Sequence, residues 1–352
     1  MDLRQLINQQ PVIGLSPMDG ITDEPFRLIQ TEIAQPDVIF TEFVSAEGIS
    51  RGGFKLYDQL LYKPQERPII GQLFGKDPQS FYAGAIILAE LGFDGIDINM
   101  GCPAKTVTAN GSGAALIENP QLASEIIKSV ANGINDWHTD KNALKKLKLK
   151  SKLDQVILRN QKYSQLKISS KIKPTLSVKT RLGINESIID QWIPHLLKHP
   201  IDFLTIHGRT LKQGYAGQAD WQQIGRVVRL AKGSGIKIWG NGDVQNRTQA
   251  QDYLKEFGVD GILIGRSAMG NPWVFSDHLP TVSEKYRCLL YHAQIYQATF
   301  PLRRFDSLRK NFLSYAVGLP NAKQLRQKLV HINNISDIID IETDFLSSTD
   351  SQ

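Results

Sequence analysis

The sequence predicts an α/β protein, namely a (β/α)8 TIM barrel followed by a small C-terminal helical domain. The first observation is that short apolar runs alternate with amphipathic stretches as far as residue 275, as they do where helices connect parallel strands. The second is that eight such units follow one another in about 260 residues, a usual length for this barrel. A doubly wound sheet is the alternative, but no GxGxxG motif follows the first apolar run.

Eight apolar runs are the expected barrel strands, and helical patterns lie between most of them. The expected strands are Val12–Ser16, Val38–Thr41, Ile69–Phe74, Ile96–Asn99, Leu176–Thr180, Phe203–His207, Ile236–Gly240 and Gly261–Gly265. Clear helical patterns cover Pro78–Leu91, Pro120–Val130, Asp220–Ala231 and Thr248–Phe257.

The character of the chain changes after Pro272 and Pro280. Residues 282–330 have helical periodicity and few strand formers, with a break at Gly318-Leu319-Pro320 between two helices. We therefore expect a barrel domain over residues 1–275, a helical domain over 276–335, and an acidic, mobile tail over 336–352.

A lysine-rich insert over about residues 133–175 separates the fourth barrel helix from the fifth strand, where a few residues would suffice. It contains ten Lys and one Arg against three Asp, a local charge of +8. Its stretch LKKLKLKSKLDQVILRN is compatible with a basic helix and equally with a mobile segment.

The net charge of +6 is unevenly distributed along the chain. Besides the insert, residues 276–330 carry nine basic and three acidic residues, whereas residues 331–352 have five acidic residues and no Lys or Arg. Two concentrated basic zones favour a polyanionic partner, although a charged, solvent-exposed face would explain either zone alone.

Composition argues against several classes of protein. Of the 352 residues 41% are hydrophobic and 22% charged, and no run of about 18 apolar residues exists, so no membrane span is expected. The N-terminal residues lack the apolar core and cleavage site of a signal peptide. Cys102 and Cys288 are too few for a disulfide framework or a metal cage, which favours a cytoplasmic protein without structural metal.

The most informative stretch is DGIDINMGCPAKTV at residues 94–107. Its β-branched run breaks directly into Gly101-Cys102-Pro103, which puts a thiol on the loop at the carboxyl end of a strand. Ligands and catalytic groups gather at that end in parallel α/β folds. Cys102 is therefore a candidate reactive thiol, with a small buried residue in a turn as the alternative.

Polar side chains end three further strands. Gln72 lies in an apolar run, and its amide suits either the imide edge of a flavin or pyrimidine or a hydrogen-bonded position in the core. Lys179 follows an apolar run, where burying an unpaired ammonium for packing alone would be costly. His207 and Arg209 end the next strand at the corresponding level. Because Cys102, Lys179 and His207 fall on strand ends of one predicted barrel, we expect them to share a site.

The last two strand ends predict a phosphate site. They are Asn241-Gly242-Asp243 and Gly265-Arg266. Loops after strands seven and eight of such barrels commonly bind phosphate through backbone N–H groups, and Arg266 would add charge. Simple turn chemistry is the alternative. With Gln72, these residues outline a site for a phosphorylated ring with an imide edge, which FMN fits.

With these motifs assembled, the chain resembles the tRNA-dihydrouridine synthase family of the bacterial type, from Ile13 to about residue 330 apart from the insert. The motifs are PMDGITDEPFR (17–27), QLFG (72–75), DINMGCPAKTV (97–107), VKTRLG (178–183), IHGRT with Tyr215 downstream, GNGD (240–243) and IGRSAMGNPWVF (264–275).

The resemblance implies an FMN-bearing barrel that reduces the C5=C6 bond of specific D-loop uridines in tRNA, with NADPH, or else NADH, recharging the flavin. It assigns Pro17 and Met18 to one side of the isoalloxazine, Gln72, Lys179 and His207 to its polar edge, and Asn241, Gly242, Asp243, Gly265 and Arg266 to the ribityl phosphate. It assigns Asn99, Arg209 and Tyr215 to the flipped uridine.

The implied mechanism is delivery of hydride to C6 by reduced FMN and protonation of C5 by Cys102 as general acid. A thiol with an ordinary pKa of about 8.5 is mostly protonated at neutral pH, which suits this role. Lys179 would offset negative charge on the flavin or the uracil. We expect a monomer.

Phosphate contacts with tRNA are expected in the helical domain, where Arg309 and Lys310 match the family's C-terminal pattern and Asn311 stands where a His is common. The other cations expected to contribute are Arg303, Arg304, Arg326 and Lys328. For the insert, an accessory tRNA-binding element and an insertion without a role in RNA binding are both open.

Two other functions are compatible with parts of the pattern. One is an FMN barrel that acts on a free pyrimidine or an enone, as dihydroorotate dehydrogenases and old yellow enzymes do, but such a substrate needs no basic helical domain. The other is a non-catalytic RNA-binding protein, against which the presence of Cys102, Lys179 and His207 argues.

Overall fold

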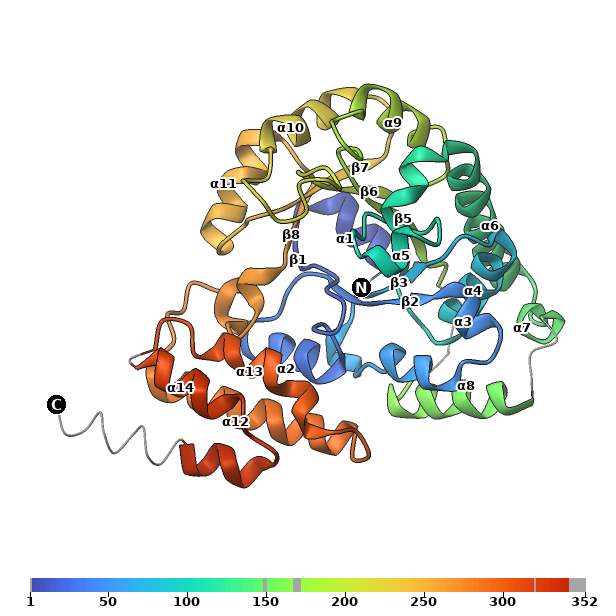
Figure 1. Ribbon diagram of the computed structural model, residues 1–352. Helices are drawn as coiled ribbons and strands as arrows, with labels where there is room; N and C mark the ends of the chain where they lie inside the picture. The colour runs from blue at the N-terminus through green and yellow to red at the C-terminus, as the bar shows by residue number, and fades with distance from the viewer. Residues whose placement is uncertain (1, 148–150, 167–171, 320, 342–352) are drawn as a thin grey trace.

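The computed structural model describes residues 2–147, 151–166, 172–319 and 321–341. Its parallel strands pair in sequence order, and β8 pairs with β1 to close the barrel. Helices surround the barrel, and a group of helices lies beside it (Figure 1). The predicted (β/α)8 barrel is confirmed.

The strands are β1 (Val12–Leu15), β2 (Ile39–Ser45), β3 (Ile69–Phe74), β4 (Gly95–Met100), β5 (Thr175–Arg181), β6 (Phe203–His207), β7 (Lys237–Asn241) and β8 (Gly261–Ile264). The α-helices are α1 (Leu3–Gln9), α2 (Glu24–Ala34), α3 (Ala46–Ser50), α4 (Pro78–Glu90), α5 (Lys105–Thr108), α6 (Pro120–Thr139), α7 (Ala143–Lys146), α8 (Ser151–Tyr163), α9 (Ile189–Leu196), α10 (Trp221–Leu230), α11 (Arg247–Phe257), α12 (Val282–Thr299), α13 (Arg309–Tyr315) and α14 (Ala322–Leu329). The 3₁₀ helices are η1 (Phe54–Leu60), η2 (Pro64–Glu66), η3 (Gly113–Glu118), η4 (Arg266–Ala268), η5 (Pro272–Phe275) and η6 (Phe305–Leu308).

The element boundaries differ most from the predicted ones in β2 and α6. The strand β2 continues to Ser45, because a register shift between Phe40 and Phe43 carries it past the polar residues that ended the apolar run. The helix α6 continues through Gly133 to Thr139. A Cβ at Gly133 would lie 2.6 Å from the backbone oxygen of Tyr82 in α4, so glycine permits the close packing of these two helices.

The amino-terminal end of the barrel is filled with apolar side chains. The residues of this cluster are Leu3, Leu6, Ile7, Val12, Val38, Phe40, Ile70, Phe203, Trp239 and Leu263. Three of them come from α1, which thus covers that end. Any ligand site inside the barrel must therefore lie at the opposite end, where the strands finish.

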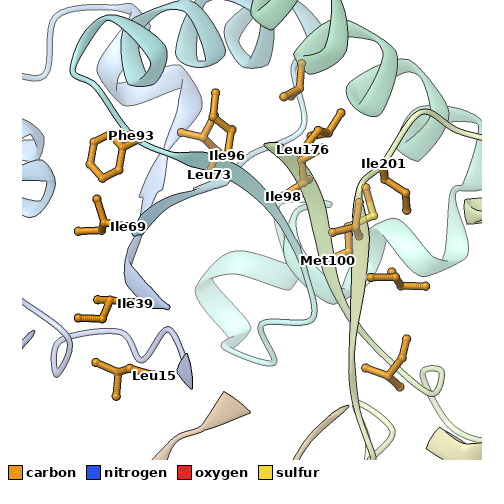
Figure 2. Close-up of a cluster of buried hydrophobic side chains, with 14 of the residues drawn as sticks. Leu15, Ile39, Ile69, Leu73, Phe93, Ile96, Ile98, Met100, Leu176 and Ile201 are labelled. Carbon is orange, nitrogen blue, oxygen red and sulfur yellow. The ribbon is translucent and has the colours of Figure 1, made fainter. Parts of the chain in front are cut away.

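Alternation along β4 separates the apolar layer from the polar interior. Ile96, Ile98 and Met100 pack in the layer between strands and helices, as Figure 2 shows. Asp97 and Asn99 alternate with them and so face the barrel interior. The strand thereby supports the fold with one face and supplies the site with the other.

The helical domain packs on the barrel through α12, which lies against α2. Ile29 of α2 belongs to the same apolar cluster as residues of α12, α13 and α14. Residues 335–341 are helical, and Ile338 and Ile341 are buried in this cluster. The start of the segment that we expected as a mobile tail is thus packed, because its isoleucines continue the helical spacing; residues 342–352 lie outside the described residues.

The insert contains α7 and α8, so its basic stretch is helical over 144–146 and again from residue 151 on. Leu153 and Ile157 of α8 are buried and join the main apolar cluster. Lys148, Lys150, Lys167 and Lys171 lie outside the described residues. Within the described ranges no helix is both long and apolar enough to span a membrane.

Candidate active site

The carboxyl ends of the strands surround a cavity of about 910 Å³. This volume is in the range of pockets that hold a cofactor-sized ligand. Thirteen residues selected from the sequence line it, namely Pro17, Met18, Gln72, Asn99, Cys102, Lys179, His207, Tyr215, Asn241, Gly242, Asp243, Gly265 and Arg266. Closure of the barrel brings these strand ends together.

A chain of side-chain hydrogen bonds crosses from β3 to β5. The Asp97 carboxylate accepts from Gln72 Nε2 at 2.7 Å and from Ser177 Oγ at 2.6 Å, while Gln72 Oε1 accepts from Asn99 Nδ2 at 2.9 Å. Burial raises the pKa of Asp97 to about 6, against the effect of these hydrogen bonds. The second N–H of Gln72 Nε2 takes no part in these hydrogen bonds. Gln72 is therefore compatible with both roles considered from the sequence, a contact to the imide edge of a ligand and a hydrogen-bonded position in the core.

Asn99 shapes the loop that carries the thiol. Its Oδ1 accepts from the backbone N–H groups of Gly101 at 3.1 Å and Cys102 at 2.9 Å. The oxygen of Cys102 in turn accepts from the N–H of Ala114 at 3.3 Å. Burial raises the pKa of the Cys102 thiol, so this group at the cavity wall is neutral near pH 7.

The strand β5 presents two cations at the cavity, because alternate residues of a strand share a face. Burial lowers the pKa of Lys179 to about 8, the charge of Arg181 adds to this effect, and Asp97 opposes it. Burial also lowers the pKa of Arg181 to about 10, which leaves it charged at neutral pH. Arg181 donates from Nε to the oxygen of Gly101 at 2.6 Å and from Nη1 to that of Thr210 at 3.2 Å, and so links the Cys102 loop to the loop after β6.

Arg181 was not selected from the sequence, although it lines the cavity. The signal was its spacing, two residues after Lys179 on one strand. Ser16, Asp19 and Phe43 also line the cavity and were not selected. The first two flank the selected Pro17-Met18 pair, whereas Phe43 lies in the part of β2 beyond the predicted strand end.

His207 is a neutral imidazole at pH 7. Burial, aided by the charges of four nearby cations, holds its pKa far below the usual value. Its Nε2 accepts from Arg209 Nη1 at 3.4 Å. A neutral imidazole can donate from its other nitrogen, so His207 can offer a hydrogen bond to a ligand without adding charge.

Asp243 pairs with two arginines at the end of β7. It accepts from Arg209 Nη2 at 2.6 Å, from Arg266 Nη2 at 2.7 Å and from the Ala219 N–H at 2.8 Å. Burial alone would raise the pKa of Asp243, but these donors hold it below its usual value. The charge of Arg266 is thus shared with a carboxylate, and its guanidinium also lies 4.9 Å from the ring centre of Tyr215.

The turn after β7 offers backbone to the cavity. Gly242 has a φ of 128° and Asp243 a φ of 58°. A Cβ at Gly242 would lie 2.6 Å from the Cβ of Ala219, so only glycine fits there without a shift. Asn241 Nδ2 donates to the oxygen of Leu263 at 2.9 Å and ties the end of β7 to β8. Such a turn, with Gly265 beside it, can accommodate an anionic group closely.

Arg209 does not line the cavity and is 1% exposed. Besides Asp243, it donates from Nε to the oxygen of Ala216 at 3.3 Å and from Nη2 to that of Gly217 at 2.7 Å. These contacts hold the loop that carries Tyr215, whose side chain is exposed at the rim. The structure thus places Arg209 against the loop, outside the cavity.

The two selected residues of α13 also lie outside the cavity. Arg309 donates to the oxygen of Ile332 at 3.1 Å and to Asn333 Oδ1 at 3.0 Å, within the helical domain. Lys310 reaches the barrel, since its Nζ lies in the space that a Cβ at Gly20 would occupy. Because both chain neighbours of Gly20 line the cavity, Lys310 lies beside the rim.

Comparison with known proteins complements this geometry. The family model described as "Dihydrouridine synthase (Dus)" matches residues 14–157 and 164–349. A "Probable tRNA-dihydrouridine synthase" of Staphylococcus aureus (strain MRSA252) is 31% identical over 344 residues, covering 93% of this chain and 91% of the relative. A "Probable tRNA-dihydrouridine synthase 2" of Bacillus subtilis (strain 168) is 30% identical over 350 residues, covering 96% and 94%.

Among solved structures, that of morphinone reductase in complex with tetrahydroNAD aligns with a TM-score of 0.42 and 11% identity, covering 78% of this chain and 89% of that one. The family match does not depend on this alignment. Since the family model and relatives at 30% identity or more span nearly all of the sequence, the chain belongs to the dihydrouridine synthase family.

Proposed function

We propose that this protein is a tRNA-dihydrouridine synthase that reduces the C5=C6 bond of specific D-loop uridines, with FMN as cofactor and NADPH as reductant. The observation that carries the proposal is one cavity that combines a neutral thiol, Cys102, with the enclosed cation Lys179 and a chain of amide groups through Gln72. Family membership supplies the reaction class.

The donor set fits FMN. Gln72, Lys179 and His207 offer hydrogen bonds to the polar edge of an isoalloxazine, and Pro17 and Met18 provide apolar contact beside them. Asn241, Gly242, Asp243, Gly265 and Arg266 form the corner for the ribityl phosphate, where Arg266 would exchange part of its pairing with Asp243 for the phosphate. FMN supplies hydride transfer to C6 when bound.

Cys102 holds the proton that C5 requires. Because burial raises the pKa of its thiol, the proton is present at Sγ throughout the neutral range. The Asn99 side chain fixes the thiol-bearing loop from within the barrel through two backbone hydrogen bonds. Cys102 is thus suited to act as a general acid at one defined position.

Lys179 supplies positive charge in the cavity, where burial shifts its proton affinity. Its pKa of about 8 leaves most of the ammonium charged at pH 7. Charge stabilisation is stronger in such an enclosed site than in water, so Lys179 can stabilise negative charge that develops during reduction.

The uridine must leave its stack in the tRNA to reach Cys102. Asn99, Arg181 and Tyr215 line the cavity around the thiol and are the candidate contacts for the base. Arg209 acts as a positioning residue, because it holds the Tyr215 loop from outside the cavity. Lys310, at the rim, is better placed for a tRNA phosphate than Arg309, which is bonded within its own domain.

The direct test is incubation of the purified protein with NADPH and unmodified tRNA transcripts, followed by mass spectrometry of nuclease fragments. We expect a gain of two hydrogens on a D-loop uridine. A protein that carries flavin and consumes NADPH yet leaves every tRNA fragment unchanged would overturn the proposed substrate. Free uridine and an enone in parallel reactions identify the small-molecule alternatives.

A further inference from the structure

The helix α8 has one buried face and one basic face. Leu153, Ile157 and Asn160 are buried, as is Ser164 just after the helix, each three or four residues from the next. Lys152, Gln155, Arg159 and Lys162 follow the same spacing on the other side and are exposed. Residues at this spacing form a single row along a helix, here about 15 Å long. We call these four residues the α8 row.

The C-terminal end of α8 is fixed between the barrel and the helical domain. Tyr163 Oη donates to Glu24 Oε1 at 2.9 Å, and Thr299 Oγ1 of α12 donates to Glu24 Oε2 at 2.9 Å. Asn160 Nδ2 donates to the oxygen of Tyr57 at 2.8 Å. Figure 1 shows this end of α8 beside the end of α12. The row therefore has a defined place relative to the helical domain.

Asp58 joins the two basic zones that are far apart in the sequence. It accepts from Arg159 Nη2 at 2.9 Å and from Arg303 Nη2 at 3.5 Å. Two cations on one carboxylate leave a net positive charge, and both arginine side chains are at least one-third exposed. The charge of Arg303 also acts on Asp23, at the start of the helix that follows the cavity rim. The row thus continues through Arg303 onto the helical domain.

Few carboxylates neutralise this surface. Asp154 is exposed on α8, and Asp306 is paired with Arg304 at 2.6 Å. In the described part of the chain, Lys152 and Lys162 have no carboxylate at ion-pair distance. Both ammonium groups are therefore available to a polyanion.

We infer that the α8 row and Arg303 form a track that binds tRNA phosphates, away from the barrel mouth and in addition to the contacts of the helical domain. The inference rests on the proposed function for the identity of the polyanion. Arg159 and Lys162 lie between the two segments that the family model matches, residues 14–157 and 164–349, whereas Lys152 lies within the first segment. Phosphate contacts of this kind add affinity and orientation without reading sequence.

The experiment compares Lys152→Gln/Lys162→Gln with the matched control Lys232→Gln/Lys255→Gln. The control lysines are also exposed but lie by α10 and α11, on the opposite side of the barrel (Figure 1). The measured quantity is the Kd for an unmodified tRNA transcript at 50 and 200 mM salt. Each phosphate contact makes Kd rise about 3.5-fold over this range, so loss of two contacts should make the rise about tenfold smaller. The control should behave as wild type.

The outcomes separate the two proposals. If the wild type forms dihydrouridine and the α8 variant keeps its salt dependence, the track is overturned and the proposed function stands. If the wild type neither binds nor modifies tRNA, the proposed function fails. If the track only binds phosphates, the α8 variant keeps the wild-type kcat at saturating tRNA and has a raised KM for tRNA. A lowered kcat in this variant would contradict a role restricted to binding.

Discussion

The cations at the barrel mouth and those of the α8 row differ in how much water surrounds them. Lys179 and Arg181 lie in the cavity, where burial lowers their pKa values to about 8 and 10. Lys152 and Lys162 are exposed on α8. An enclosed charge acts strongly over a short distance and has an altered proton affinity, whereas an exposed charge is screened by salt. One residue type thus serves chemistry in one place and binding in the other.

The largest effect is expected from Cys102→Ala, in the enclosed region. Loss of the general acid should lower dihydrouridine formation by about 10²- to 10⁴-fold, while flavin content and tRNA affinity stay near wild type. Mass spectrometry of the product gives the rate. Cys288→Ala is the matched control, because Cys288 is buried in the helical domain, away from the cavity. Full activity of Cys102→Ala would remove this residue from the acid role.

Lys179→Gln tests whether the enclosed charge stabilises the reaction. We expect a loss of about 10²-fold in kcat. The pKa of about 8 also predicts that the wild-type rate falls as pH rises through 8, since the ammonium then loses its proton. The variant should lack this alkaline limb in a pH profile of kcat. The same limb in Lys179→Gln would assign it to another group, such as the Cys102 thiol.

His292, in the core of the helical domain, extends the comparison to a buried group whose pKa is lowered by burial. Burial lowers its pKa to about 3, and its Nε2 has no hydrogen-bond partner among the described residues. The unfolded chain takes up a proton below pH 6.5 and the folded chain does not, so stability is lost as pH falls through 6.5. At pH 4.5 this amounts to about 2–3 kcal/mol.

His292→Phe should therefore lose less stability than wild type between pH 7 and pH 4.5, as measured by urea unfolding. The variant gives up the contact of His292 Nδ1 with Tyr315 Oη at 3.2 Å, which lowers its stability at both pH values alike. Replacement of the exposed His331 by Gln is the control and should keep the wild-type pH dependence. An unchanged pH dependence in His292→Phe would assign the acid sensitivity to other groups.

The smallest effect is expected from Lys310→Gln, at the exposed rim. One lost phosphate contact should raise KM for tRNA several-fold and reduce the slope of log Kd against log salt by about 0.9, with kcat unchanged. Initial rates at two salt concentrations measure both. A drop in kcat instead would show that Lys310 affects the reaction itself. The assignment of chemistry to the enclosed cations and of binding to the exposed cations would then be wrong.

Local sequence patterns were sufficient to predict the barrel and most of the residues that line the cavity. The alternation Ile96-Asp97-Ile98 predicts a strand and shows which side chains face the barrel interior, because side-chain direction in a strand alternates with a period of two. The break at Gly101-Cys102-Pro103 marks the end of this strand. The same argument placed Lys179 and His207 at the mouth. The argument from apolar runs failed where a strand extends beyond its apolar run, as β2 does at Phe43.

Local sequence patterns were therefore enough to predict the fold class, the end of the barrel that carries the site, and the grouping of Cys102, Lys179 and His207. The partners of the charged side chains follow from the folded structure: Arg209 and Arg266 share Asp243, and Arg159 and Arg303 share Asp58. These pairs join residues far apart in the chain, and they exist only once barrel closure and helix packing bring them within hydrogen-bond distance. Periodicity is a local property, whereas charge pairing and burial depend on the whole fold.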